Sequence, residues 1–193
     1  MDRRYERNIG MLSIEEMAKV RASSVCVIGC GGLGGYIIEM LARLGVGRIT
    51  AVDGDVFDET NLNRQLLSHP GNIGIGKASE AETRVRLINP DVSVVPLCVF
   101  LDEKNAEAII SGHDVVDALD SITARLILQE ACKKEGIPMV HGAIAGWYGQ
   151  VSTIIPGSDT LKLLYPDNNG NSKGIEKQLG NPSFTPALVA SVE

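Results

Sequence analysis

The sequence has no excess of positive charge, no long apolar run and no paired cysteines. Eighteen Lys plus Arg stand against 24 Asp plus Glu among 193 residues, so the formal net charge of −6 creates no general field that attracts nucleic acid or anionic lipid. Gly, Arg or Glu interrupts each apolar stretch well before the ~18 residues that a membrane span needs, and the N-terminal residues lack the apolar core of a signal peptide. We therefore predict a cytoplasmic protein that binds neither nucleic acid nor membrane.

The four cysteines are too scattered to form a metal site or a set of disulfides. Cys26, Cys30, Cys98 and Cys132 include no Cys-x-x-Cys pair, and no His lies near them at ligand spacing. Cys26, Cys98 and Cys132 fall in apolar patterns and are expected in the core. Cys30 lies in a glycine loop at a helix start, where its thiol pKa can be lowered, but we expect no catalytic role for it.

Strand-like and helix-like apolar patterns alternate at least four times, which is typical of a parallel sheet wrapped by helices. The predicted fold class is therefore α/β, with a Rossmann-like, mostly parallel sheet, an antiparallel extension and a long crossing loop. Pro96 donates no hydrogen bond and indicates an edge or bulged strand. The expected strands span 24–28, 48–52, 92–100, 113–119, 137–140 and 149–155, with helices at 13–21, before Gly45, and at 77–88, 102–111 and 121–134.

The composition of 44% hydrophobic and 22% charged residues fits one domain with four parts. We expect an N-terminal helical arm over 1–22, a Rossmann-like core over 23–156, a crossing loop over 157–185 rich in Asn and Gly, and the start of a helix over 186–193. Because the last apolar pattern stops without a cap, we expect the chain to be a fragment.

A glycine loop predicts a nucleotide site. Gly29-Cys30-Gly31-Gly32-Leu33-Gly34 follows a strand and begins a helix, and Asp53 ends the next strand. The first glycine permits a tight turn, Gly31 lets the backbone approach a phosphate, and Gly34 allows close packing of helix and strand. Asp53 is expected to bind ribose hydroxyls. This pattern does not choose between NAD and ATP.

Two cations and a second acid favour a polyphosphate. Lys77 is predicted at a helix start, where its charge opposes the helix dipole unless an anion binds there. Arg64 follows Asp53, whose charge would repel the 2′-phosphate of NADP. The alternative is that Arg64 and Lys77 are solvated surface charges. Asp120 follows a strand and is a candidate Mg²⁺ ligand, because Mg²⁺ needs few protein carboxylates; the alternative is a simple helix N-terminal charge.

Taken together and in this order, these segments resemble the ThiF, MoeB and HesA group of adenylyltransferases, relatives of the ubiquitin-activating enzymes. The resemblance covers nearly the whole chain. The matching pieces are Arg4-Tyr5-Glu6-Arg7, the Gly29 to Gly34 loop, Asp53-x-Asp55, Asn61-Leu62-x-Arg64-Gln65, Gly76-Lys77, Asp120 with Arg125, and Tyr165-Pro166-Asp167.

The resemblance implies ATP- and Mg²⁺-dependent adenylylation of the C-terminal glycine of a small ubiquitin-like sulfur carrier ending in Gly-Gly, with release of pyrophosphate, in a cofactor pathway such as thiamine or molybdopterin synthesis. It also implies a homodimer in which Arg7 reaches the partner's active site. The implied catalytic residues are Arg7, Arg64, Lys77 and Asp120, the last as Mg²⁺ ligand, and the implied nucleotide-binding residues are Gly29, Gly31, Gly32, Gly34, Asp53, Asp55, Asn61, Arg64, Gln65 and Lys77.

The sequence departs from that family in two places. Many relatives hold zinc with paired Cys-x-x-Cys motifs, one of them just before Tyr165, but this chain has Leu161-Lys162-Leu163-Leu164 there, so zinc is not expected. Residues 157–193 contain no cysteine, although some relatives carry a conjugating cysteine in the crossing loop. The departures imply adenylylation without a carrier-linked thioester at that loop.

Two other function classes remain open. An NAD-dependent oxidoreductase would use the same glycine loop, but it needs an acid or base, and His69, His113 and His141 show no obvious carboxylate partner in the sequence. Of these, His141 is the least easily dismissed, and a structural role is favoured for it. A non-enzymatic, nucleotide-responsive scaffold would explain the missing cysteine in the crossing loop, but it would have little need for Arg64 and Lys77.

Overall fold

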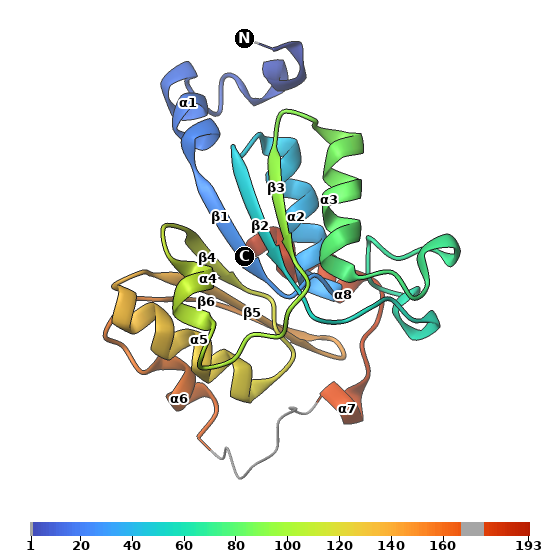
Figure 1. The fold of residues 1–193 in the computed structure, drawn as a ribbon, viewed down its shortest axis with the longest axis vertical. Helices are drawn as coiled ribbons and strands as arrows, with labels where there is room; N and C mark the ends of the chain where they lie inside the picture. The colour runs from blue at the N-terminus through green and yellow to red at the C-terminus, as the bar shows by residue number, and fades with distance from the viewer. Residues whose placement is uncertain (1, 167–175) are drawn as a thin grey trace.

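The computed structural model describes residues 2–166 and 176–193, and a twisted six-stranded sheet forms its centre (Figure 1). The strand order is β3-β2-β1-β4-β5-β6; β1 to β5 run parallel and β6 runs antiparallel to β5. The strands are β1 (Ser24–Ile28), β2 (Arg48–Val52), β3 (Ser93–Leu97), β4 (Asp114–Asp117), β5 (Met139–Ala145) and β6 (Tyr148–Ile154). The predicted fold class, including the antiparallel extension, is confirmed.

Helices cover both faces of the sheet, because the strands alternate apolar side chains between two cores (Figure 1). In β1, Val25 and Val27 pack toward α2 (Gly32–Leu44), α3 (Lys77–Ile88) and α8 (Phe184–Val192). Cys26 and Ile28 pack toward α4 (Ala106–Ile110), α5 (Ile122–Glu135) and α6 (Thr160–Leu164). A strand buried on both faces reads as a continuous apolar run, as β1 does.

The N-terminal residues lie beyond the amino-terminal ends of the strands (Figure 1). The short 3-10 helix η1 (Arg3–Asn8) places the buried Tyr5 ring against Gly45, where any Cβ would collide with it. Helix α1 (Ile14–Ala22) begins with the predicted capping box, in which Ser13 and Glu16 each accept the other's backbone N–H. Both elements are therefore fixed at the edge opposite the carboxyl ends of the strands.

Four predicted boundaries around the site differ from the structure, and one of them is the end of β5, which was expected at Val140 and lies at Ala145. Strand β3 is an edge strand, as Pro96 indicated, but it ends at Leu97, so Cys98 is exposed rather than part of the core. Strand β4 ends at Asp117, which moves Asp120 into the turn before α5. Helix α4 is shorter than the expected 102–111, and Asp102 accepts hydrogen bonds from backbone N–H groups in the turn before it.

The span 157–185, expected to be a loop, contains α6 and α7 (Glu176–Leu179) in its described parts. Helix α6 forms because Leu161 is fully buried against α5 and its N–H donates to Gln129 Oε1 at 2.8 Å. Helix α8 begins at Phe184, two residues before the expected Pro186, which is compatible with a first turn whose N–H groups lack helical partners. Asp167 lies outside the described residues. No described helix combines the length and the apolarity needed to cross a bilayer.

Candidate functional site

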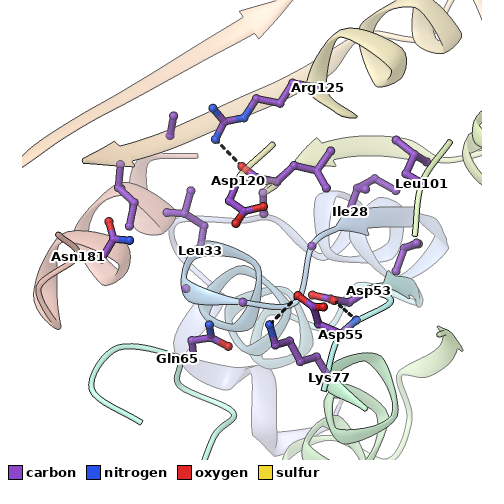
Figure 2. Close-up of a pocket in the computed structure, with 18 of the residues that line it drawn as sticks. Ile28, Leu33, Asp53, Asp55, Gln65, Lys77, Leu101, Asp120, Arg125 and Asn181 are labelled. Atoms are coloured by element: carbon purple, nitrogen blue, oxygen red, sulfur yellow. Dashed lines mark hydrogen bonds and ion pairs between the residues drawn. The ribbon is translucent and has the colours of Figure 1, made fainter. Parts of the chain in front are cut away.

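A cavity of about 560 Å³ opens at the carboxyl ends of the parallel strands, where doubly wound sheets bind ligands (Figure 2). It lies at the topological switch point of the sheet, between β1 and β4, from which successive strands are added in opposite directions. Nine of the predicted site residues line this cavity. They are Gly29, Gly31, Gly32, Asp53, Asp55, Arg64, Gln65, Lys77 and Asp120.

The glycine loop has the backbone geometry that its motif predicted. Gly29 has a φ of +99°, a conformation that side chains disfavour, and a Cβ on it would meet the carbonyl of Ala118 at 2.6 Å. A Cβ on Gly34 would overlap the carbonyl oxygen of Gly29, so Gly34 lets α2 approach the loop, although it does not line the cavity. No side chain caps α2 at Gly31, which leaves the first N–H groups of the helix available to an anion.

Asp53 joins the end of β2 to the glycine loop. Its Oδ2 accepts the N–H of Cys30 at 2.8 Å and its Oδ1 accepts the N–H of Asp55 at 2.8 Å. Burial raises the pKa of Asp53, and these two hydrogen bonds and the nearby Lys77 oppose that rise. Burial, reinforced by the charge of Asp53, also raises the pKa of the Cys30 thiol well above its ordinary value. The expectation that the helix start lowers this pKa was wrong.

Lys77 lies at the first position of α3 and points into the cavity (Figure 2). Its side chain is 9% exposed, and Nζ lies 3.3 Å from Asp55 Oδ2. Its backbone N–H donates to the Asp55 carbonyl at 3.0 Å, which fixes the start of the helix. Lys77 is therefore a buried cation with one partially exposed carboxylate partner, and not a solvated surface charge.

Arg64 and Gln65 reach the cavity from the turn after the 3-10 helix η2 (Glu59–Asn61). Arg64 Nη1 donates to the Thr60 carbonyl at 2.8 Å and to Asn63 Oδ1 at 3.0 Å, so its guanidinium is half-buried and held on its own loop. Gln65 is buried beside Gly31, and within the described chain its Oε1 has no hydrogen-bond partner. This buried oxygen at the cavity wall is suited to accept a hydrogen bond from a bound ligand.

Asn61 and Arg7 lie outside the cavity. Asn61 is buried, accepts the Asp58 N–H at 3.2 Å, and its carbonyl accepts the N–H groups of Arg64 and Gln65. It therefore shapes the loop that carries the two residues. Arg7 is exposed on η1, at the opposite edge of the sheet (Figure 1). This chain alone does not bring it to the site.

Asp120 is exposed and faces the middle of the cavity, between the glycine loop and Arg125 (Figure 2). Across the part of the chain that the structure describes, no group of three His, Cys, Asp or Glu side chains could hold a metal ion. One carboxylate still fits Mg²⁺, which completes its coordination with water and phosphate oxygens, whereas zinc requires more protein ligands.

The cavity continues past Asp120 to a polar end that the sequence did not predict as a site. Arg125, Gln150 and Tyr165 line it. The Tyr165 hydroxyl accepts Arg125 Nη1–H at 3.0 Å and Gln150 Nε2–H at 2.8 Å, and it lies 3.2 Å from His141 Nε2. The motif comparison included Arg125 and Tyr165 without assigning them roles.

His141 has the carboxylate partner that its sequence neighbours lack. Its Nδ1 lies 2.7 Å from Asp117 Oδ2, and both side chains are fully buried. The two residues pair directly in the register of the parallel strands β4 and β5. Because that register is a tertiary feature, no spacing along the chain could have revealed the pair. His141 lies behind the cavity wall, which disfavours a direct role as the acid or base of an oxidoreductase.

Comparisons with a family model and with known proteins point to the same family. The model described as the ThiF family matches residues 5–192. The chain is 41% identical to the SAMP-activating enzyme E1 of Haloferax volcanii over 167 residues, in a match that covers 85% of this chain and 62% of that protein. It is 40% identical over 143 residues to the sulfur carrier protein ThiS adenylyltransferase of Bacillus subtilis, covering 72% of this chain and 43% of that protein.

A solved structure supports the same likeness. The E. coli tRNA N6-threonylcarbamoyladenosine dehydratase, in complex with ATP, has a TM-score of 0.72 and 32% identity, covering 75% of this chain and 60% of that one. The chain thus spans about three fifths of that structure and of the archaeal relative, and less than half of the bacterial adenylyltransferase.

Proposed function

Because the chain belongs to the ThiF family, we propose that it is an ATP- and Mg²⁺-dependent adenylyltransferase. Its second substrate is the C-terminal glycine carboxylate of a small ubiquitin-like sulfur carrier, and pyrophosphate is the leaving group. One observation carries the proposal: a single cavity joins a glycine loop at a helix start, a ribose-type acid, two cations and a further carboxylate. An NAD site would use the first two features and leave the cations unexplained.

The glycine-loop end of the cavity fits ATP. The uncapped start of α2 at Gly31 suits a phosphate, and Asp53 suits the ribose hydroxyls. Lys77 is buried with its ammonium at the cavity, and Arg64 adds a second positive charge, so both neutralise a polyphosphate. Structures and names of relatives support this assignment, since one of them was solved with ATP.

Catalysis here requires positioning and charge neutralisation more than a protein nucleophile. When bound, ATP supplies an adenylyl group, which a carboxylate oxygen of the carrier accepts as the bond to pyrophosphate breaks. The incoming carboxylate is already ionised, so no residue has to remove a proton. Lys77 and Arg64 stabilise negative charge on the phosphates, and such a group lowers the activation free energy by about 3 to 4 kcal/mol. Asp120 would hold Mg²⁺, which would neutralise negative charge on the phosphates.

We infer a carrier protein, rather than a nucleic acid, as the second substrate. Two of the relatives are named for activating SAMP or the sulfur carrier ThiS, while the solved dehydratase is named for a modified tRNA. The formal net charge of −6 on this chain opposes binding to a polyanion, since nucleic-acid affinity depends on neutralising phosphates. A cytoplasmic location and a role in cofactor synthesis stay predictions that accompany this function.

The same proposal includes a homodimer in which Arg7 acts in the partner's site. Arg7 is exposed on η1, beyond the amino-terminal ends of the strands, whereas Asp120 lines the cavity at their carboxyl ends. Any role of Arg7 in catalysis therefore requires a second copy. Mixing an Arg7→Ala protein with an Asp120→Ala protein tests this. Partial recovery of activity in the mixture is expected because some mixed dimers contain one intact site; inactivity of the mixture, with dimers present, would contradict it.

Two measurements test the proposed function. Calorimetric titration with MgATP and with NAD⁺ should show binding of MgATP alone, whereas preferential NAD⁺ binding would favour an oxidoreductase. ATP–pyrophosphate exchange in the presence of a carrier ending in Gly-Gly should then be measurable and should fall severalfold or more in Asp120→Ala. Unchanged exchange at limiting magnesium would remove Asp120 from the mechanism. Binding of MgATP and carrier without exchange would favour a scaffold.

A further inference from the structure

The polar end of the cavity contains a buried chain of hydrogen bonds that the proposed nucleotide site does not use. It runs from Asp117 through His141 to the Tyr165 hydroxyl, which also contacts Arg125 and Gln150. These five residues come from β4, β5, the segment after α6, α5 and β6. A largely buried polar network assembled from five elements is costly where a member lacks a partner, so its arrangement is specific; within the described residues, the atom of this network without a hydrogen-bond partner is Arg125 Nε.

Counting donors and acceptors assigns the protons of this network. A tyrosine hydroxyl has one proton to donate and two lone pairs to accept with. Arg125 Nη1 and Gln150 Nε2 can only donate, so they occupy the lone pairs of the Tyr165 oxygen. His141 Nε2 can accept the proton of that hydroxyl, and Gln150 Nε2, which can only donate, also lies 3.3 Å from His141 Nε2, so this ring nitrogen acts as an acceptor. His141 is then neutral, with its proton on Nδ1, and donates to Asp117.

The position of Arg125 depends on this arrangement. Its Nη1 donates to Tyr165, its Nη2 donates to the Leu119 carbonyl, and its Nε lies 4.0 Å from Asp117 Oδ2. That Nε has no hydrogen-bond partner within the described chain, and the side chain is about nine-tenths buried. Its guanidinium carbon lies 5.5 Å from the centre of the Tyr165 ring. The guanidinium is thus held at the cavity wall from three sides.

We propose that Asp117, His141 and Tyr165 are positioning residues that aim the Arg125 guanidinium at the carboxylate of the second substrate. This inference rests on the proposed function, because it assigns the acceptor end of the same cavity. Arg125 lies on the far side of Asp120 from Lys77, so the cavity has Lys77 and Arg64 for the phosphates and a separate cation, Arg125, for the incoming carboxylate (Figure 2). A planar guanidinium suits a carboxylate because it can donate two parallel hydrogen bonds.

The variant Asp117→Asn tests the proton assignment without changing the shape of the side chain. The Asn oxygen would keep the hydrogen bond from the Leu119 N–H, which Asp117 Oδ1 now accepts at 3.1 Å. Its NH₂ would face His141 Nδ1 as a donor and move the imidazole proton to Nε2. The Tyr165 oxygen would then face three donors, and Arg125 or Gln150 would lose its place.

Nitrogen-15 NMR of the imidazole reads the tautomer directly. We expect the proton of His141 on Nδ1 in the unmodified protein and on Nε2 in Asp117→Asn. The exposed Asp114 on the same strand provides the matched control, and Asp114→Asn should leave the tautomer unchanged. A proton on Nε2 in the unmodified protein would overturn the inference.

Tyr165→Phe is a second variant, which removes one oxygen and leaves the Asp117–His141 pair intact. Both variants should raise the carrier KM in pyrophosphate exchange tenfold or more, while the MgATP KM stays within twofold. A merely structural defect would change both constants or the fraction of folded protein. Unchanged carrier KM in Asp117→Asn and in Tyr165→Phe would overturn the positioning role.

A peptide titration separates this inference from the proposed function. A peptide ending in Gly-Gly with a free carboxylate should shift the Arg125 Nε–H signal in the presence of MgATP, and its C-terminal amide should not. If the signal shifts only with the free carboxylate but no carrier supports ATP–pyrophosphate exchange, the proposed adenylyltransferase function is refuted and the carboxylate subsite is supported. Exchange in the unmodified protein with no such shift would refute the subsite and leave the adenylyltransferase standing.

Discussion

One end of the cavity is formed mainly by backbone groups of the glycine loop, and the other end is formed mainly by side chains around Arg125. Where β1 meets α2, the six residues Gly29 to Gly34 form a tight turn and an uncapped helix start, and Asp53 accepts the N–H of Cys30 in that turn. Around Arg125, by contrast, the contacts are mainly between side chains from five separate elements. Both ends face the same cavity.

The difference teaches what each end can tolerate. The glycine-loop end depends on the absence of side-chain atoms at its glycines. A larger residue there collides with neighbouring backbone atoms, even where it adds no polar group. A network of side chains depends on the count of donors and acceptors, so an isosteric change of one proton can rearrange it.

Removing the buried cation of the glycine-loop end should have the largest effect. Lys77→Met keeps the length and burial of the side chain and removes its charge, so pyrophosphate exchange should fall by about 10² to 10³, or about 3 to 4 kcal/mol. Lys104, which is exposed in the turn before α4, serves as the control. Exchange within threefold of the unmodified rate in Lys77→Met would exclude the assigned role.

Adding one methyl group to the glycine loop should be the next largest effect. A Cβ in Gly34→Ala would overlap the Gly29 carbonyl oxygen, and backbone cannot move aside cheaply, so the free energy of unfolding should fall by about 3 kcal/mol. Gly32 is the matched control, because a Cβ there meets only Pro186 at 3.6 Å, an ordinary contact. Equal denaturation midpoints for Gly34→Ala and Gly32→Ala would contradict the steric argument.

The side-chain end should reveal itself in the pH dependence of stability. Burial raises the pKa of Glu193, at the end of α8, to about 8 from its ordinary 4.5, and the charge of Asp117 adds to the rise. Between these two values only the folded state holds the proton, so the free energy of unfolding falls with rising pH by about 1.4 kcal/mol per unit.

The variant Glu193→Gln isolates that contribution, because the other groups titrate in both proteins and cancel in the difference. Chemical denaturation of the two proteins between pH 5 and about 8 should give a difference that grows in favour of the variant as the pH rises. A difference independent of pH would show that Glu193 keeps its charge in the folded protein.

Thiol chemistry should produce the smallest effect on stability. Burial raises the pKa of Cys26 and Cys132 to about 12, and it also raises the pKa of Cys30 well above its ordinary value. Cys98, by contrast, is exposed, with its Sγ 3.2 Å from Ser79 Oγ. A thiol reagent should label Cys98 alone in the folded protein, as mass spectrometry can check. Cys98→Ser should change stability by less than about 0.5 kcal/mol. Labelling of Cys30 would contradict the burial of the glycine loop.

Local patterns were sufficient to predict the glycine-loop end. The glycine spacing, the strand before it and the acid after the next strand lie within 30 residues, and each constrains backbone that neighbours in the chain largely determine. The capping box at Ser13 and the edge position of Pro96 were predicted for the same reason. The sequence also predicted that Lys77 begins a helix, although only the structure shows that the side chain is buried against Asp55.

Longer-range features were predicted poorly. The Leu161 helix was missed because its stability comes from burial against α5, while its composition is typical of a loop. Cys98 was assigned to the core because the apolar run continues past the point where β3 leaves the sheet. Asp120 was expected at the end of β4 and lies three residues beyond it, since pairing with β1 ends at Asp117.

The sequence by itself determined the α/β fold class, the glycine loop and most of the residues that line the nucleotide end, because apolar periodicity and glycine conformation act over a few residues. Only the tertiary structure decided that Asp117 pairs with His141, that Tyr165 joins them and that Arg125 faces the cavity. The cause is strand register: which residues of two neighbouring parallel strands lie side by side depends on how the connecting helices pack against the faces of the sheet, and no local pattern encodes that.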